Sequence, residues 1–249
     1  MKIAFFGGTF DPVHRGHLEV ARAAAKRFDL SLVYFSPADI PPHKQKRKLA
    51  SFEHRFAMVA LATAGDKRFI PSLLDAYTGG PNYSLETVRR LKNTLGKSDR
   101  LYFLIGMDAF EEIGTWYKPV ELLHECEFIV VSRPSYSLDD AARALPKALR
   151  PPEPVLEKLS KQQIGTIELP GTAIHRLDDV WESVSSTQIR AAARKPAKQL
   201  SRLVPAPVAE YIEKQHLYLD AGGKWKAGRA AQGKMLSFER SISRSRKNE

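Results

Sequence analysis

Four short runs of apolar residues, each about as long as a strand, constrain the fold of this chain most strongly. They span residues 3–6, 32–35, 101–105 and 128–131, and each run is apolar on both faces. Strands of this kind lie inside parallel sheets that helices cover on both sides. A weaker run at 69–74 predicts one more strand.

Amphipathic helical patterns separate these runs. Apolar side chains recur at helical spacing in 18–28, 51–64 and 84–95, and Ser51 is suited to cap the second of these helices. Alternating strands and helices predict an α/β fold, a doubly wound (Rossmann-like) parallel sheet with helices on both faces. Ligands of such sheets bind at the carboxyl ends of the strands.

The later part of the chain is less regular. Residues 135–165 show helical patterns broken by prolines, and 167–169 is a candidate for a further short strand. Two short helices are predicted at 185–194 and 207–214. We expect a single domain over residues 1–218.

Charge is unevenly distributed along the chain. Lys and Arg number 39 against 28 Asp and Glu, which gives a net charge of +11. Residues 222–249 hold eight basic and two acidic side chains, so this end carries about half of the excess. We expect residues 219–249 to form a basic, disordered C-terminal tail. The charge favours an anionic partner. The alternative function, from another class than an enzyme, is therefore a nucleic-acid-binding protein that uses this tail. The rest of the chain carries less net charge than the tail, which argues against nucleic acid as the main partner.

Composition also limits the compartment. Cys126 is the sole cysteine, which excludes an internal disulfide and fits a reducing environment. No apolar stretch approaches the roughly 20 residues that span a bilayer, and the first apolar run is too short for a signal peptide. We expect a cytoplasmic protein with no membrane partner, and the sequence leaves its oligomeric state open.

The first apolar run leads directly into the string GGTFDPVHRGH at residues 7–17. Gly7 and Gly8 allow the backbone to turn sharply and to approach a ligand closely. The helix that follows offers unpaired N–H groups and a positive dipole end, which favour phosphate. His14 and His17 are three residues apart and can point to one side of the helix start. A zinc site is disfavoured, because no clear Cys, third His or carboxylate stands at ligand spacing.

This string is similar to the signature of the nucleotidyltransferases of the HxGH type. Further segments match the bacterial nicotinate-nucleotide adenylyltransferases in particular: PPHK at 41–44, IGMD at 105–108, TWY at 115–117, SRP at 132–134 and SSTQIR at 185–190. The resemblance extends over about residues 1–218. It implies an enzyme that transfers the adenylyl group of ATP to nicotinate mononucleotide, giving deamido-NAD and pyrophosphate in NAD biosynthesis.

The residue types suit this chemistry. A phosphate oxygen of one nucleotide attacks the α-phosphate of ATP, and this nucleophile is already an anion, so no general base is required. The barrier comes from bringing anions together and from charge on the departing pyrophosphate, so positioning and electrostatics supply the catalysis. Histidines, basic side chains and helix N-termini serve these ends.

The resemblance implies three sets of site residues. The expected catalytic residues are His14, His17 and Arg190. The residues expected to bind ATP and its phosphates are Gly7, Gly8, Thr9, Phe10, Lys44, Gly106, Asp108, Arg133, Ser185, Ser186 and Thr187. The residues expected to bind the nicotinate nucleotide are Ser84, Trp116 and Tyr117, with the indole as a stacking surface for the pyridine ring.

Several of these residues also have structural interpretations. Ser185 to Arg190 alone fits an ordinary N-cap with a surface arginine. Asp108 can cap a helix, Trp116 can belong to the core, and Arg133 can form a structural ion pair. Lys44 lies in a run of charged residues that is typical of a solvated loop.

Substrate and cofactor follow from the same resemblance. ATP reacts as its magnesium complex, so Mg²⁺ is the expected cofactor, with no dedicated protein cage. Two related activities stay open. A phosphopantetheine adenylyltransferase usually has Thr where His14 stands, and a nicotinamide mononucleotide adenylyltransferase would need to accept an amide near Ser84 and Tyr117.

Overall fold

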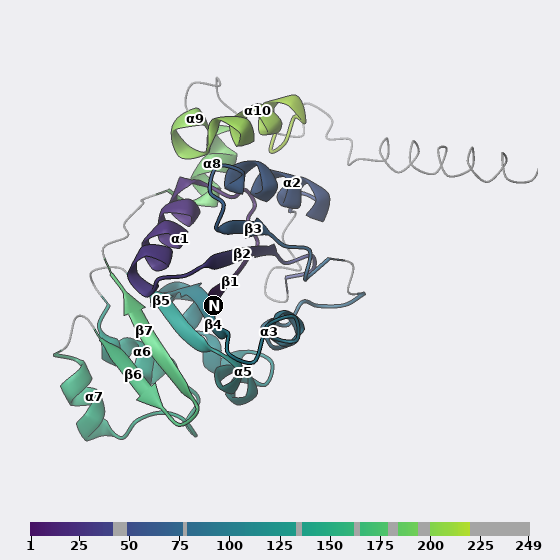
Figure 1. Cartoon of the computed structure of the whole chain (residues 1–249). Coiled ribbons are helices and arrows are strands. Elements are labelled where there is room, and N and C mark those ends of the chain that lie inside the picture. Colours follow the sequence, from purple (N-terminus) through teal and green to yellow (C-terminus); the bar gives the residue numbers. More distant parts are fainter. Residues whose placement is uncertain are drawn as a thin grey trace, which may run out of the picture.

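The computed structural model describes residues 1–41, 49–76, 79–132, 136–161, 165–178, 184–193 and 200–219. A seven-stranded sheet in the order β3-β2-β1-β4-β5-β7-β6 forms its centre (Figure 1). Its parallel strands are β1 (Lys2–Gly8), β2 (Leu32–Pro37), β3 (Phe69–Pro71), β4 (Arg100–Gly106), β5 (Glu127–Val131) and β7 (Thr172–Leu177). The edge strand β6 (Thr166–Leu169) runs antiparallel to β7.

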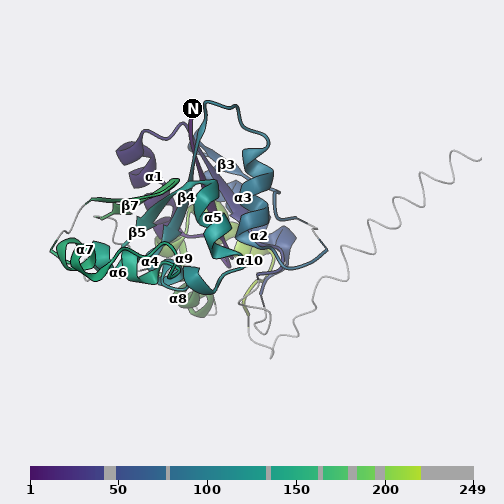
Figure 2. The same ribbon diagram turned by 90° about the horizontal axis from the view of Figure 1, so that it is seen from below.

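Helices cover both faces of the sheet (Figures 1 and 2). One face carries α1 (Arg15–Phe28), α2 (Phe52–Thr63), α8 (Ser186–Ala192), α9 (Leu200–Leu203) and α10 (Ala206–Lys214). The other carries α3 (Ser84–Lys92), α4 (Met107–Phe110), the 3₁₀ turn η2 (Ile113–Thr115), α5 (Pro119–Glu125), α6 (Leu138–Ala144) and α7 (Glu153–Leu159). Within the described ranges, no helix is both long and apolar enough to cross a membrane.

The two helical layers explain why the strands are apolar throughout. In β1, Ile3 and Phe5 pack into the core under α3 to α7, while Ala4 and Phe6 pack into the core under α1, α2 and α8 to α10. Successive strand side chains point to opposite faces, and both faces are buried here. The predicted doubly wound α/β fold is confirmed.

The far edge of the sheet differs from the expectation. The segment 172–177 forms β7, which the sequence pattern does not predict, and a tight turn at Gly171 (φ 79°) joins it to β6. His175 and Arg176 interrupt the apolar pattern of β7, and His175 Nε2 lies 2.7 Å from the Glu127 carboxylate of β5. The sheet is therefore mostly parallel, with an antiparallel pair at this edge.

Candidate active site

The predicted phosphate motif forms the loop between β1 and α1. The backbone takes its left-handed turn at Phe10 (φ 47°), and not at Gly7 or Gly8, which end β1. The two glycines leave room for neighbouring rings. A Cβ at Gly7 would lie 2.8 Å from the Phe5 ring, and one at Gly8 would lie 3.1 Å from the Phe10 ring. The glycines therefore let aromatic rings pack closely beneath the loop, which differs from the expected sharp turn.

His14 and His17 lie side by side at the start of α1. Their ring centroids are 3.7 Å apart, and the backbone N–H of His14 donates a 3.2 Å hydrogen bond to His17 Nδ1. An accepting Nδ1 carries no proton, so the proton of a neutral His17 ring lies on Nε2. The expectation that the two histidines point to one side is confirmed.

His14 is the more deeply buried of the two, with 7% of its surface exposed. Burial disfavours the charged ring and lowers the pKa of His14 to about 4. The Nδ1 atom of this buried ring has no hydrogen-bond partner among the described residues. An anion beside the ring would stabilise its protonated form.

Helix α8 packs its first turn directly onto this loop. Ser186 Oγ donates to the carbonyl oxygen of Pro12 at 3.1 Å, and Arg190 Nη1 donates to that of Asp11 at 2.6 Å. Arg190 also contacts Thr187 Oγ1 at 2.9 Å. Ser185 caps the helix by accepting from the backbone N–H of Gln188. The structure thus brings together two motifs that lie about 175 residues apart in the sequence.

Two buried charged residues that the sequence analysis does not single out organise the loop. Asp11 accepts hydrogen bonds from the Tyr218 hydroxyl at 2.9 Å and from the backbone N–H of Ala50 at 3.2 Å. Arg55 of α2 is 1% exposed. Its guanidinium donates to the carbonyl oxygens of Thr9, Ala38, Asp39 and Ala50. A basic residue inside an otherwise apolar helical stripe is the one signal in the sequence that could have pointed to Arg55.

A cavity of about 280 Å³ lies beside the start of α3. It brings together the three residues predicted to bind the nicotinate nucleotide, Ser84, Trp116 and Tyr117. The Tyr83 and Tyr117 rings stack at 4.4 Å, and Trp116 packs against the core that includes Phe103. Four further residues line the cavity and were not among the predicted site residues: Asn82, Tyr83, Thr115 and Leu122.

The cavity also borders the N-terminus of α3. The N-cap residue of α3, Tyr83, makes no side-chain hydrogen bond to the first turn of the helix, which begins at Ser84. The N–H groups of an uncapped first turn need acceptors, and the helix dipole adds a positive potential there. A planar anion whose ring contacts aromatic side chains would match this combination.

The remaining predicted residues fall into two groups. Gly106 and Asp108 are exposed at the carboxyl end of β4, next to β1 in the sheet, with Gly106 at the N-cap of α4 and Asp108 in its first turn. Lys44 and Arg133 lie outside the described residues. In the part of the chain that the structure describes, no group of three or more His, Cys, Asp or Glu side chains could hold a metal ion.

Comparison with known proteins identifies the family. The sequence model of the "Cytidylyltransferase-like" family matches residues 5–192. A protein of Geobacter sulfurreducens named "Probable nicotinate-nucleotide adenylyltransferase" is 36% identical over 225 residues, which cover 89% of this chain and all of that protein. The chain belongs to the cytidylyltransferase-like family. A relative of the same name from Thermoanaerobacter sp. is 36% identical over 220 residues, which are 88% of this chain and 94% of that protein. The family relationship predicted from the motifs is confirmed.

Two solved structures share the fold. The nicotinic acid mononucleotide adenylyltransferase of Plasmodium falciparum, in a complex with NaAD, superposes with a TM-score of 0.63 at 16% identity. The match covers 87% of this chain and 97% of that one. A second structure of that enzyme, in a complex with APC, gives a TM-score of 0.62 with the same identity. At this identity the likeness concerns the fold alone.

Proposed function

We propose that this chain transfers the adenylyl group of ATP to nicotinate mononucleotide, giving deamido-NAD and pyrophosphate as a step of NAD biosynthesis. The convergence of α8 on the loop after β1 carries this proposal, because it joins two phosphate-binding motifs at one edge of the sheet. The relatives named as nicotinate-nucleotide adenylyltransferases, 36% identical over nearly their whole length, support it.

The triphosphate binds between the loop after β1 and the first turn of α8. His14, His17 and Arg190 stabilise the charge that develops on the α-phosphate and on the departing pyrophosphate. Ser185, Ser186 and Thr187 present hydroxyls and N–H groups at the start of α8, as Gly7 to Phe10 present backbone groups in the loop. Lys44 and Arg133 provide further positive charge.

The nucleoside part of ATP extends toward the end of β4. Gly106 leaves the backbone accessible there, and the Asp108 carboxylate accepts hydrogen bonds from ribose hydroxyls. Asp108 is exposed in the first turn of α4, so it can reach a ligand at this edge.

The pyridine ring of the mononucleotide occupies the cavity beside α3. Trp116 and Tyr117 offer flat apolar faces. The nicotinate carboxylate binds the N–H groups of the first turn of α3, the Ser84 hydroxyl and the backbone near Tyr117. A carboxylate gains more from this positive helix end than the neutral amide of nicotinamide does, so the acid is the preferred substrate.

In the reaction, a phosphate oxygen of the mononucleotide forms a bond to the α-phosphorus of ATP. The bond from that phosphorus to the oxygen bridging to the β-phosphate breaks, and its electron pair leaves with pyrophosphate. ATP enters as its magnesium complex, and Mg²⁺ is held mainly by the phosphate oxygens. The protein contributes orientation and positive charge.

A product assay tests the proposal. The full chain is incubated with Mg-ATP and either nicotinate mononucleotide or nicotinamide mononucleotide, and dinucleotide and pyrophosphate are measured. We expect a clear preference for the nicotinate form. A preference for the amide would overturn the substrate assignment, and the absence of pyrophosphate with both would overturn the adenylyl transfer.

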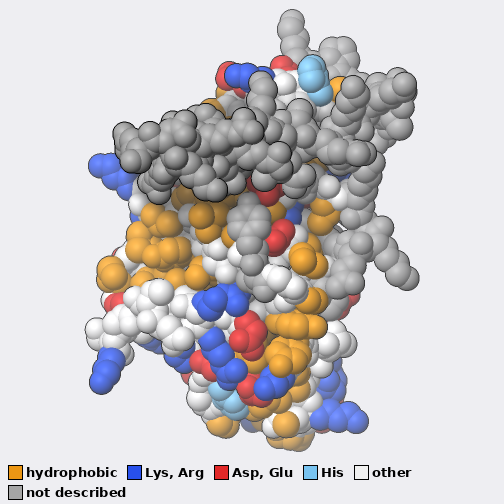
Figure 3. Space-filling view, turned by 90° about the vertical axis from the view of Figure 1, so that its right-hand side faces the viewer, with side chains coloured by type: hydrophobic (Ala, Val, Ile, Leu, Met, Phe, Trp, Pro, Cys, Tyr) orange, Lys and Arg blue, Asp and Glu red, His pale blue; other side chains and the backbone are white. Residues whose placement is uncertain are grey.

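The domain boundary belongs to the same proposal. Residues 1–218 form the nucleotidyltransferase domain, and 219–249 are a basic tail that the reaction does not need. Basic and acidic side chains are interspersed on the face shown in Figure 3. Elsewhere in the described chain, ion pairs such as that of Arg89 with Glu121 and Glu125 neutralise part of the charge.

Removal of 222–249 should leave adenylyl transfer intact. If the full chain instead lacks transfer and binds DNA or RNA with a steep salt dependence, the nucleic-acid alternative holds. A cytoplasmic location fits this proposal, because ATP is available there and a reducing environment suits a chain with a single cysteine.

A further inference from the structure

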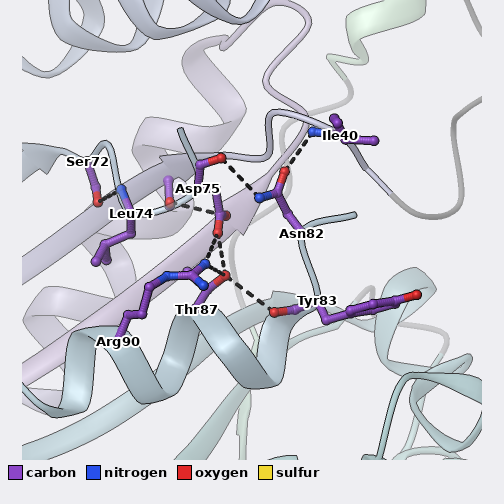
Figure 4. Close-up of polar contacts among 9 residues, drawn as sticks. Ile40, Ser72, Leu74, Asp75, Asn82, Tyr83, Thr87 and Arg90 are labelled. Atoms are coloured by element: carbon purple, nitrogen blue, oxygen red, sulfur yellow. Dashed lines mark hydrogen bonds and ion pairs between the residues drawn. The ribbon is translucent and has the colours of Figure 1, made fainter. Parts of the chain in front are cut away.

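Asp75 is a buried carboxylate that the proposed mechanism does not use. It is 3% exposed and lies between the end of β2 and helix α3 (Figure 4). Its Oδ1 atom accepts hydrogen bonds from Thr87 Oγ1 and, at 3.0 Å, from Arg90 Nη2. Its Oδ2 atom accepts from Ser36 Oγ at 3.3 Å. A buried carboxylate is costly unless such donors satisfy it, so this cluster fixes α3 against β2.

Asn82 continues this cluster toward the phosphate loop. Its side-chain amide donates to the carbonyl oxygen of Asp75 at 3.0 Å, and its Oδ1 accepts from the backbone N–H of Ile40 at 2.6 Å. The backbone N–H of Asn82 donates in turn to the carbonyl oxygen of Ile40 at 3.0 Å. Asn82 therefore holds Ile40 through its backbone and through its side chain, whose contact Figure 4 shows.

The segment that Asn82 holds is also tied to the loop after β1. The backbone N–H of Ala38 donates to the carbonyl oxygen of Gly8 at 2.9 Å. Arg55 bridges the carbonyl oxygens of Thr9 and Ala38 at 2.9 and 2.6 Å. Residues 38–40 thus connect the phosphate loop on one side with the wall of the cavity on the other.

We propose that Asp75 and Asn82 are positioning residues that hold the first turn of α3, and with it the pyridine cavity, at a fixed place relative to the phosphate loop. This inference rests on the proposed function. Asn82 lines the cavity together with Ser84, and Asp75 holds α3 through Thr87, at the end of its first turn, and Arg90, in its second turn. Hydrogen-bonded contacts of this kind align a bound nucleophile with its target.

Asp75→Asn tests the proposal with little change in volume. In one orientation the amide turns its NH2 group toward Thr87 and Arg90, and in the other it turns this group toward Ser36 Oγ, which can accept. In both orientations the negative charge that pairs with Arg90 is lost. We expect the KM for nicotinate mononucleotide to rise about tenfold, while the KM for ATP stays within about twofold. A residue that only stabilises the fold would lower the melting temperature without separating the two KM values.

A matched pair at position 87 removes or keeps a single donor. Thr87→Val deletes the hydroxyl with little change in shape, and should raise the mononucleotide KM as Asp75→Asn does. Thr87→Ser keeps the hydroxyl and should restore most of the binding. Glu127→Gln is the control, because it also removes a carboxylate that forms ion pairs. Glu127 lies at the start of β5, away from the cavity, and pairs with Arg100 and His175. This control should change neither KM.

Three outcomes would contradict the inference. Asp75→Asn with unchanged kinetics would show that the cluster does not position the cavity. An equal rise of both KM values would show a general loss of structure, and Thr87→Ser behaving like Thr87→Val would show that the hydroxyl is not the cause. If the wild-type chain makes no product from nicotinate mononucleotide, the proposed function itself fails, which the wild-type assay reveals before any variant is compared.

Discussion

Arg190 of α8 donates a 2.6 Å hydrogen bond to the backbone carbonyl of Asp11, and this contact joins the end of the domain to its first loop. The Asp11 carboxylate, with one oxygen 3.8 Å from the same guanidinium, is bound on its other oxygen by the Tyr218 hydroxyl. The proposed triphosphate site is therefore assembled from both ends of the domain. A change at Arg190 should affect the reaction and the loop together.

We predict that Arg190→Ala lowers kcat/KM for ATP by about 10²-fold, since it removes a charge-assisted contact to the phosphates. Steady-state kinetics with ATP varied at saturating mononucleotide measures this. Arg202→Ala is the matched control, because Arg202 is an exposed arginine on the neighbouring helix α9. If both substitutions lowered kcat/KM by the same factor, the net positive charge of the protein, and not the position of Arg190 beside the loop, would support the reaction.

His17→Ala should lower kcat by about 10²- to 10³-fold, because the ring stabilises the transition state electrostatically. The ring is half-buried, so the melting temperature should change little. Turnover and thermal unfolding of the same preparation measure both quantities, with the exposed His124 replaced by Ala as the control. An unfolded His17→Ala protein, or a fully active one, would refute the role assigned to His17.

Burial of His14 predicts a pH-dependent stability. Its folded pKa of about 4 lies below the ordinary value of 6.5, so the unfolded chain binds more protons between these pH values. The contribution of the neutral His14 ring to the free energy of unfolding is therefore fully present above about pH 6.5, and it is lost as the pH drops toward 4. From pH 7 to 5 the loss attributable to this ring is about 2 kcal/mol. Urea unfolding at both pH values measures the loss, and His14→Asn should reduce it. An equal loss in both proteins would assign the effect to other groups.

Arg55→Lys should destabilise the protein by about 3 kcal/mol, because a lysine ammonium cannot satisfy four buried carbonyl oxygens. The carbonyls belong to the loop after β1 and to residues 38–50, so activity should fall as well. Arg68→Lys, at a partly exposed pair with Asp66, should cost no more than about 1 kcal/mol. Urea unfolding of both variants gives the comparison, and similar values would show that Arg55 is not the organising residue.

Binding of ATP should change the protonation of the site. A polyphosphate next to His14 favours the charged ring, so its pKa rises when ATP binds. We therefore expect the protein to take up protons when ATP binds near pH 5.5. Calorimetric titration in two buffers with different ionisation enthalpies measures this uptake. Equal apparent enthalpies in the two buffers would place the phosphates away from His14.

The sequence by itself determined the layered α/β fold and the positions of most of its elements. Runs that are apolar on both faces, such as 101–105, fit a strand between two helical layers, and Gly7 to His17 carries the chemistry of a phosphate site in consecutive residues. Such features are local, so periodicity and motif spacing reveal them. Strand β7 lacks such a local pattern, because His175 and Arg176 interrupt its apolar residues. In the folded chain, His175 bonds to Glu127 of β5 and Arg176 donates to Ser132 Oγ.

Only the tertiary structure decided which distant residues meet. Asp75 looks like an ordinary charged residue in the sequence, and Arg55 stands out only as a basic residue in an apolar helical stripe. Both are buried because groups from separate segments satisfy them: backbone carbonyls for Arg55, and hydroxyls and the Arg90 guanidinium for Asp75. The left-handed backbone at Phe10 and the close packing of the Phe5 ring against Gly7 likewise become visible only in the folded chain. Packing and hydrogen bonding between segments far apart in the chain set these features, and the pattern of any one segment does not contain that information.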